Sequence, residues 1–562
     1  MTQGQRKACL LGVCALIILA VAGCGFLHSY AAYRNRDINR NTYFDLPADP
    51  HTEDPLLYLD EDYTVRDGFH SNLPIVILSM ESDLADYKGF QDQEEYLTGE
   101  EPYIKGHISV IDGGMFDNCI TDTPVSQSEL LIKKRGHTSY TFDKAQYLLK
   151  LKTAEGLENN VDILGMGAHD SWILNGSMAD KSMIRNYLAY RISSEVSEVT
   201  PDSQFCEVVI QEGDRYVYQG LYLMMETVAR DVNRVPIDSF NEKNLYTSYI
   251  VRRDRFTHFD KMLETGRRLE GLSEEWIGLK YPSEERITEA ALHYIEKDFS
   301  EIERVIYSDR EDVFATYDKY IDVDTFVDYF LLNEYFGNYD AGMHSTYMYK
   351  NSGEPLKIGP VWDFDQAMNN YSMEEMETQT MAFQERPFFD RFTKDIRFVD
   401  ALQARYAVLQ RSTLSHDHIC DVIDETTAYI RSAREREWYR WAADYYDDSR
   451  QNWHNYYLFD YLDEDNVLVS RFNDNYDQEI YNIKTYLYKH GKAMQTELRV
   501  LEKSTLYDTS IRGENKLFLL IVMILFFMPA VLIIRKGWSD LWYCSARSPR
   551  RQCRRGIIFC RR

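Results

Sequence analysis

Residues 333–370 read NEYFGNYDAGMHSTYMYKNSGEPLKIGPVWDFDQAMNN, and this stretch decides the fold around it. Within it, Ser345–Lys350 alternates like a strand. Asn351–Pro355 has the composition of a tight turn, and Leu356–Trp362 is typical of a returning strand. The stretch therefore predicts a β-hairpin.

The hairpin is expected to bring two distant acidic side chains together. Folding the chain about Gly353 places Ser345 close to Val361. Asp340 and Asp363 then emerge at the same end of the hairpin, although 23 residues separate them in the sequence.

Asp365 and Asn338 are expected to join this pair. Along an extended Asp363-Phe364-Asp365 segment, side chains alternate in direction, so both carboxylates point to one face. Like charges are costly to bury together unless a cation or a proton compensates them. Oxygen ligands of this kind suit Mg²⁺ or Mn²⁺. The sequence therefore predicts a divalent metal site beside Asp340.

This grouping fits the chemistry of phosphoryl transfer. One carboxylate, Asp340, would orient a substrate hydroxyl and accept its proton, while Asp363 would hold the metal on the phosphates of ATP. Such a reaction requires mainly positioning and charge neutralisation. The alternative is that Asp340 caps a helix or turn, with Asp363 and Asp365 solvated at a strand end.

A basic stretch at 133–152, KKRGHTSYTFDKAQYLLKLK, is a candidate phosphate site. Arg135 and Gly136 begin a small loop whose backbone N–H groups could face an anion. Lys144 follows, and then a strand on which Lys150 and Lys152 share a face. The alternative is an ordinary basic edge strand. No GxGxxG or GxxxxGK[ST] motif is present.

A third candidate is Glu226, at which a strand within the stretch YQGLYLMMETV (residues 218–228) is expected to end. It follows the β-rich part of the chain, where a hinge between two lobes would lie. The alternative is a core strand with an exposed glutamate.

The periodicity along the chain predicts an α+β protein with a β-rich first half and a helical second half, hence two lobes with a cleft between them. The expected strands are 73–79, 107–111, 129–134, 147–153, 205–211 and 216–226, and the expected helices are 181–195, 291–306, 323–335, 398–413, 421–443 and 477–503. The predicted divisions are 1–24 (signal or anchor), 25–70 (linker), 71–235 (β-rich lobe), 236–290 (connector), 291–420 (helical lobe with the hairpin), 421–512 (helical extension), 517–534 (membrane span) and 535–562 (basic tail).

The composition excludes some classes of partner and scaffold. The 562-residue chain has a net charge of −27, which disfavours nucleic acid because phosphate binding requires a basic surface. Of its nine cysteines, three lie in the central region, which allows one disulfide at most: Cys119, Cys206 and Cys420.

Two apolar segments predict a membrane protein. Leu10–Gly23 follows Arg6 and Lys7 and ends at Cys24, which is typical either of a lipidated export signal or of an uncleaved anchor. Leu517–Ile534 is long enough to span a bilayer, and a basic tail follows it. Basic residues favour the cytoplasmic side, so residues from about 25 to 512 are expected outside the cell.

Together these motifs resemble the CotH kinase family. The motifs are Arg135-Gly136-His137-Thr138-Ser139 with Lys144 and Tyr147; Trp172-Ile173-Leu174-Asn175 with Asp180, Arg185 and Asn186; Tyr218-Gln219-Gly220-Leu221-Tyr222 with Glu226; Asn333-Glu334 with Asn338 and Asp340; and Gly359-Pro360-Val361-Trp362-Asp363-Phe364-Asp365.

The resemblance implies an atypical protein-kinase-like fold that transfers phosphate from ATP to serine. It implies Asp340 as the catalytic aspartate, Asp363 as a metal ligand, and either Lys144 or Lys150 as the phosphate lysine. Kinases commonly carry a metal-binding asparagine five residues after the catalytic aspartate. This chain has Ser345 there, preceded by His344, so Ser345 is the expected metal ligand.

Three functions are therefore in competition. The first is an extracytoplasmic kinase acting on a hydroxyl of a surface protein or envelope polymer. The second is a surface binding or adhesion protein that keeps the fold without turnover. The third takes Asp340 and Asp363 as the carboxylate pair of a glycosidase, which would need no nearby lysine.

Overall fold

The computed structural model describes residues 46–81, 103–114, 117–136, 143–176, 178–244, 246–256, 260–265, 277–370, 378–446, 461–462, 468–469 and 475–508. The chain divides into a compact unit of residues 1–506 and a second unit of residues 507–562, and the elements below belong to the first. The predicted membrane segments 10–23 and 517–534, Cys24 and the basic tail lie outside the described residues.

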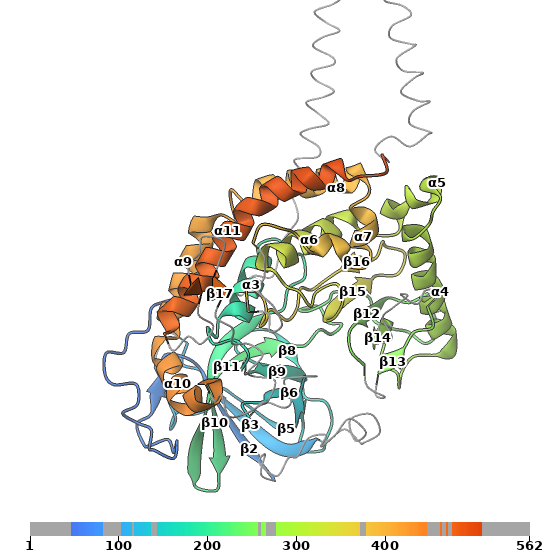
Figure 1. Ribbon diagram of the computed structural model, residues 1–562. Helices are drawn as coiled ribbons and strands as arrows, with labels where there is room; N and C mark the ends of the chain where they lie inside the picture. Colours follow the sequence, from blue (N-terminus) through green and yellow to red (C-terminus); the bar gives the residue numbers. More distant parts are fainter. Residues whose placement is uncertain are drawn as a thin grey trace, which may run out of the picture. The chain divides into compact units, whose positions relative to one another are not determined.

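Seven strands form a closed barrel in the order β10-β11-β9-β6-β5-β3-β2 (Figure 1). Neighbouring strands are antiparallel except β10 and β2, whose parallel pairing, with Glu207 opposite Ile75, closes the barrel. The bounds are β2 (Ile75–Met80), β3 (Ile104–Ile111), β5 (Ser126–Arg135), β6 (Gln146–Lys152), β9 (Ser171–Asn175), β10 (Ser203–Glu212) and β11 (Arg215–Glu226). The sequence predicts all of these strands except β9, whose apolar run of three residues gives too short a pattern.

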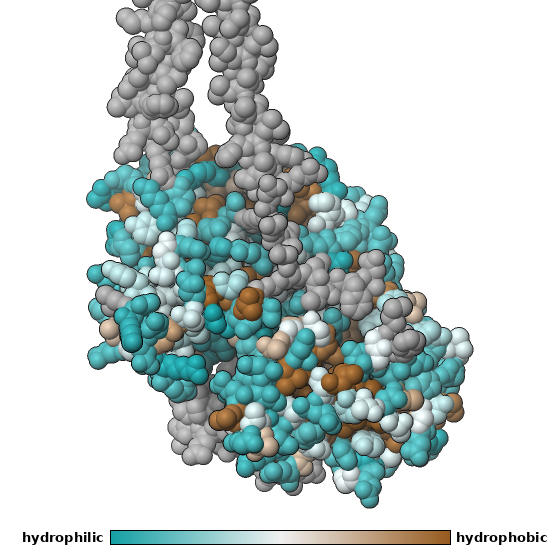
Figure 2. Space-filling view, turned by 180° about the vertical axis from the view of Figure 1, so that it is seen from behind, coloured by the Kyte–Doolittle hydropathy of each residue, from teal (hydrophilic) through white to brown (hydrophobic). Residues whose placement is uncertain are grey.

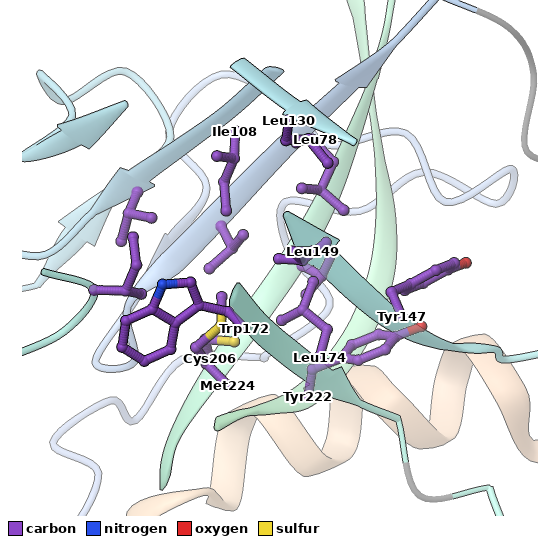
Figure 3. Packing of buried hydrophobic residues seen from close by; sticks show 14 of the residues in the cluster. Leu78, Ile108, Leu130, Tyr147, Leu149, Trp172, Leu174, Cys206, Tyr222 and Met224 are labelled. Atoms are coloured by element: carbon purple, nitrogen blue, oxygen red, sulfur yellow. The ribbon is translucent and has the colours of Figure 1, made fainter. Parts of the chain in front are cut away.

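Alternate side chains of each strand fill the barrel. In β6, Leu149 points inward to a cluster that includes Trp172 and Leu174 (Figure 3), and Leu151 belongs to the same cluster. Because successive residues of a strand face opposite sides, Lys150 lies on the outer face of β6.

The outer face of β2 is also buried. Ile75 and Ile77 pack against Leu59, Val65 and Phe69 from the segment that precedes the barrel. This double burial explains why β2 is continuously apolar rather than alternating.

Residues 236–290, predicted as a charged connector, contribute three strands to a second sheet. Its order is β13-β14-β12-β15-β16, with every neighbouring pair antiparallel. The strands of this segment have two to five residues, too few to give a clear period of two. The bounds are β12 (Tyr249–Arg253), β13 (Lys261–Met262), β14 (Ile277–Tyr281), β15 (Thr346–Lys350) and β16 (Lys357–Ile358).

The helical part confirms the mixed α+β class, and α11 packs against α8, α6 and α9 (Figure 1). The bounds are α3 (Arg185–Ser193), α4 (Glu289–Ile306), α5 (Glu311–Phe314), α6 (Val323–Phe336), α7 (Phe389–Phe392), α8 (Ile396–Leu409), α9 (His416–Tyr429), α10 (Arg431–Tyr446) and α11 (Tyr476–Lys503). Short paired strands complete the elements: β1 (His70–Ser71) with β4 (Asn118–Cys119), β7 (Val161–Asp162) with β8 (Ala168–His169), and β17 (Tyr461–Leu462) with β18 (Leu468–Val469).

Two predicted helices differ most from the structure, and the ends of others shift by a few residues, as in α8, which ends at Leu409 and not at 413. The helix expected from residue 181 begins at Arg185, because Met183 adopts a left-handed conformation with φ of 62°. The helix expected over 421–443 is divided into α9 and α10, since Ile430, with φ of −90° and ψ of 8°, lies outside the helical region.

The surface is mainly polar. Hydrophilic side chains cover most of the described face shown in Figure 2. Within the described ranges, none of the helices combines the length and the apolar character that crossing a bilayer requires. Cys119, Cys206 and Cys420 are free thiols.

Buried ion pairs attach α10 to the barrel. Lys144, which is 2% exposed, places its Nζ 2.7 Å from Glu437 Oε1 and donates to the carbonyl oxygen of Leu221 at 2.6 Å. Glu437 Oε2 in turn accepts the Leu221 backbone N–H at 2.8 Å. Arg436 forms a second buried pair with Glu207 at 2.6 Å.

Replacing Glu437 with alanine is expected to destabilise the fold by about 3–5 kcal/mol, because it leaves the Lys144 ammonium buried without its counter-charge. The double variant Lys144→Met/Glu437→Leu should recover much of this loss, since neither charge then remains. Urea unfolding measures both. As a control, Asp312→Ala removes an exposed ion pair and should change stability by less than about 1 kcal/mol. If Glu437→Ala and Asp312→Ala lowered the free energy of unfolding equally, the role given to Glu437 would be contradicted.

Candidate active site

The hairpin at 345–362 has the predicted register. Met348 is opposite Ile358 and Tyr349 is opposite Lys357, and the same pairing continued places Ser345 opposite Val361. At this end, Ser345 Oγ donates to Asp363 Oδ2 at 3.3 Å. The two ends of the hairpin are therefore in side-chain contact.

A short loop after α6 carries Asp340. The helix ends at Gly337, whose φ of 62° is a left-handed conformation that glycine adopts without strain. Asn338 Nδ2 then donates to Asn333 Oδ1 at 3.2 Å and to the carbonyl oxygen of Trp362 at 3.1 Å. Asn338 therefore fixes the loop of Asp340 against the chain that enters Asp363.

Helix α3 holds the backbone of the Asp363-Phe364-Asp365 segment. The N–H of Asp363 donates to Tyr190 Oη at 3.2 Å, and the N–H of Phe364 donates to Asn186 Oδ1 at 2.7 Å. Phe364 is fully buried with its ring against Tyr190. Helix α3 thus fixes the backbone that carries the carboxylates of Asp363 and Asp365.

Arg185 fixes the chain just beyond this segment. Its guanidinium donates to the carbonyl oxygens of Ala367 at 3.0 Å and Met368 at 3.4 Å. Asp180, at 2.6 Å, and Glu479 of α11, at 2.7 Å, pair with the same guanidinium. The sequence motif of Asp180, Arg185 and Asn186 is therefore placed around the acidic segment.

Two residues of the site have strained backbones. Ser345 has φ of 49° and Asp363 has φ of 62°, a left-handed region that costs side-chain-bearing residues free energy. Such conformations persist only where the surroundings impose them, and they concentrate at functional sites.

A pocket of about 1180 Å³ brings the predicted groups together. Asp340, Asp363 and Asp365 line it, together with Lys150 and Arg135 of the barrel. Nine of its lining residues are Lys or Arg and nine are Asp or Glu, so the formal charges of the lining balance, although the whole chain has a net charge of −27. His344, Ser345 and Trp362 also line it.

Burial and mutual repulsion make the carboxylates hard to ionise. Burial, and next the charge of Asp340, raise the pKa of Asp363 to about 6, although Arg135 and the Ser345 hydrogen bond oppose this rise. Burial and the charges of Asp363 and Asp340 raise the pKa of Asp365 well above its usual value. The pKa of Asp340 is raised mainly by burial, with Arg255 acting in the opposite direction. A divalent cation bound by Asp363 and Asp365 would relieve the repulsion, and carboxylate oxygens are the donor type that Mg²⁺ and Mn²⁺ prefer.

Positive charge gathers on the wall formed by the barrel and β14. Lys280 is accessible to water, but the pocket surrounds it, and this desolvation is the main reason that its pKa is lowered to about 8. Repulsion from Arg252, and to a smaller extent from Lys150 and Arg135, adds to the effect. A polyanion such as a triphosphate would reduce this repulsion.

The structure separates the two lysines that the sequence leaves open. Lys150 lines the pocket, whereas Lys144 is absent from its described lining and is buried against Glu437. Glu226 is also outside that lining: it is buried, accepts the backbone N–H of Asp202 at 3.0 Å and lies 3.4 Å from Arg234.

Sequence reasoning does not find Lys280, Arg252 or Asp254 as lining residues. They lie in the segment predicted as a connector and enter the site only because β12 pairs with β15. An isolated lysine or arginine on a short strand gives no sequence signal of that pairing.

Comparison with known families identifies the family to which these motifs belong. The family model described as CotH kinase protein matches residues 132–494, which include Asp340, Asp363, Asp365 and Lys150. A search of curated proteins finds no match.

Replacing Asp363 with asparagine is expected to stabilise the metal-free protein at pH 8. Because the folded-state pKa near 6 exceeds the ordinary 3.8, ionised Asp363 destabilises the fold above pH 6, and this penalty disappears as the pH falls toward 4. The gain should be about 1–3 kcal/mol, since one pKa unit corresponds to about 1.4 kcal/mol. Urea unfolding in EDTA at pH 8 and pH 4 measures it.

Two further observations check this reading. Mn²⁺ should stabilise the wild type more than Asp363→Asn, because the variant lacks one ionised ligand. Glu158→Gln, which neutralises an exposed carboxylate of the same pocket, should change stability little. An Asp363→Asn protein that is less stable than the wild type at pH 8 in EDTA would refute the proposed repulsion.

Proposed function

This chain belongs to the CotH kinase family, and from that membership we propose that it transfers the γ-phosphate of ATP, bound with Mg²⁺ or Mn²⁺, to a hydroxyl group of another molecule. The observation that supports this function best is the shared pocket, in which Asp340, Asp363 and Asp365 lie together with Lys150 and Arg135. Phosphoryl transfer requires carboxylates that hold the metal and orient the acceptor, and cationic side chains that contact the phosphates, in the same pocket.

The aspartates would have different roles. Asp340 would orient the acceptor hydroxyl and accept its proton as the new oxygen–phosphorus bond forms and ADP leaves. Its raised pKa makes it a better proton acceptor than a solvated aspartate. Asp363 and Asp365, with Ser345, would hold the metal, which supplies charge neutralisation on the phosphates.

The barrel side would bind the rest of the nucleotide. Lys150, Arg135 and Lys280 would neutralise phosphate oxygens, since all three line the pocket. Leu148 and Ile173 line the same pocket and offer apolar surface for a base. In this proposal the barrel is the first lobe of a kinase-like fold and the part with the hairpin is the second.

We further propose a location outside the cell and a hydroxyl-bearing acceptor there. The apolar segments 10–23 and 517–534 support a membrane-anchored protein, with Cys24 as a possible site of lipidation and the pocket outside the cell. The acceptor would then be a hydroxyl, such as that of serine, on a surface protein or an envelope polymer. The acidic chain disfavours nucleic acid as a partner.

A surface binding protein without turnover is the second candidate. It is favoured by Ser345, which stands where kinases commonly have a metal-binding asparagine. A glycosidase is disfavoured, because Lys150 and Arg135 share the pocket with the carboxylates and a neutral sugar requires no such cations.

Asp340→Ala is expected to lower the rate of phosphate transfer by about 10²–10⁴-fold, the usual contribution of a general base. The assay incubates the full-length protein with γ-labelled ATP, Mn²⁺ and an envelope fraction, and measures label on the protein itself and on the fraction. Glu158→Gln is the matched control and should keep the wild-type rate, since it removes an exposed pocket carboxylate. Equal label with wild type and Asp340→Ala, or none with either, would contradict the kinase proposal.

Ser345→Asn is expected to tighten Mn²⁺ binding and raise the transfer rate. Asparagine tolerates the left-handed φ of 49° better than serine, and its amide oxygen is a stronger metal ligand. Ser345→Ala should have the opposite effect, because it removes the oxygen that contacts Asp363. Mn²⁺ titration and the same transfer assay measure both; if neither variant differs from the wild type, Ser345 is not at the metal.

A further inference from the structure

A second cluster of metal-binding side chains lies where the described chain approaches the barrel. His51 and Glu53 precede the barrel, and His70 lies in β1. Asp117 directly precedes β4, the partner of β1. The cluster shares no residue with the pocket and lies outside residues 132–494, which the family model matches.

The cluster has the dimensions of a metal site. One ligand atom from each of His51, Glu53 and His70 lies within 4.8 Å of the other two. His70 Nε2 is 2.7 Å from Glu53 Oε1, and His51 Nε2 is 3.1 Å from Asp117 Oδ2. Two imidazole nitrogens and two carboxylate oxygens therefore converge.

In both histidines, Nδ1 already has a hydrogen-bond partner. His51 Nδ1 lies 2.7 Å from Asp49 Oδ1, and His70 Nδ1 lies 2.9 Å from the carbonyl oxygen of Gly68. A ring whose Nδ1 donates a hydrogen bond carries its lone pair on Nε2. Carboxylates and backbone carbonyls orient metal-binding histidines in this way.

His51 provides an independent indication of a ligand. Its side chain is 9% exposed, and Nε2 is buried without a hydrogen-bond partner among the described residues, although Asp117 Oδ2 is close. A buried polar atom left without a partner costs free energy. A cation between this nitrogen and the carboxylates would satisfy all of them.

We propose that His51, Glu53, His70 and Asp117 bind one divalent transition-metal ion of the zinc class. Two nitrogen and two oxygen donors suit a four-coordinate ion of this kind, with ligand distances of about 2.0–2.2 Å. The ligand atoms of His51, Glu53 and His70 lie within 4.8 Å of one another, and Asp117 Oδ2 lies 3.1 Å from His51 Nε2, so the four side chains can close around one ion by small side-chain rotations.

The ion would have a structural role. Asp49, which orients His51, also accepts the backbone N–H of Ser432 at 2.9 Å, at the start of α10. The metal would therefore hold together the segment that contains His51 and Glu53, the β1–β4 pair and the start of α10. Metal binding would contribute directly to the stability of this region.

Equilibrium dialysis of ZnCl₂ against the chelator-stripped full-length protein, followed by elemental analysis, tests the site. Asp363→Ala serves as the background, because it removes a proposed metal ligand of the pocket. The Asp363→Ala variant should bind one equivalent of Zn²⁺. When Co²⁺ replaces Zn²⁺, the variant should show the visible absorption of a tetrahedral Co²⁺ ion. Combining Glu53→Gln or His70→Ala with Asp363→Ala should weaken Zn²⁺ binding by at least about 10-fold. Loss of a residue that only hydrogen-bonds a metal ligand already costs about that much, and loss of a ligand should cost more.

Two controls keep the result interpretable. Glu53 is exposed, so Glu53→Gln should fold even if His70→Ala does not. His293→Ala removes an exposed histidine of α4 and should leave the stoichiometry and affinity unchanged. Failure to bind Zn²⁺ in the background, or equal affinity with and without Glu53→Gln, would overturn the proposal. Neither result depends on kinase activity.

Discussion

The burial of Asp340, Asp363 and Asp365 close to one another is the constraint on which the rest of the structure depends. Burial raises the pKa of all three carboxyl groups, and the charge of Asp340 raises the pKa of Asp363 and Asp365 further, which a fold tolerates only if other interactions hold the chain there. The left-handed backbones of Ser345 and Asp363 add a further cost.

The interactions that meet this cost come from three parts of the chain. Helix α3 supplies Asn186 and Arg185, which hold the backbone on either side of Asp365. The end of α6 supplies Asn338, and α11 supplies Glu479, which neutralises Arg185. Few of these contacts touch the space a substrate would occupy, so their role is to position the carboxylates.

The sequence predicts the part of the site whose residues lie close together along the chain. A single hairpin relates Asp340 to Asp363, so strand alternation and one glycine turn suffice to place them together. Alternation also places Lys150 on the outer face of β6, although sequence alone does not choose it over Lys144. That choice depends on Glu437, 293 residues away, which buries Lys144 against α10. Likewise, Lys280 enters the pocket through strands too short to show a period.

The central claim is that one pocket binds a metal–triphosphate between the carboxylates and the barrel cations. A crystal structure of the full-length protein with Mn²⁺ and a non-hydrolysable ATP analogue tests it most directly. The expected result is anomalous density from Mn²⁺ within coordination distance of Asp363 and Asp365, with phosphate oxygens against Lys150 and Arg135. Nucleotide bound elsewhere, or Mn²⁺ and nucleotide absent from this pocket at saturating concentrations, would contradict the claim.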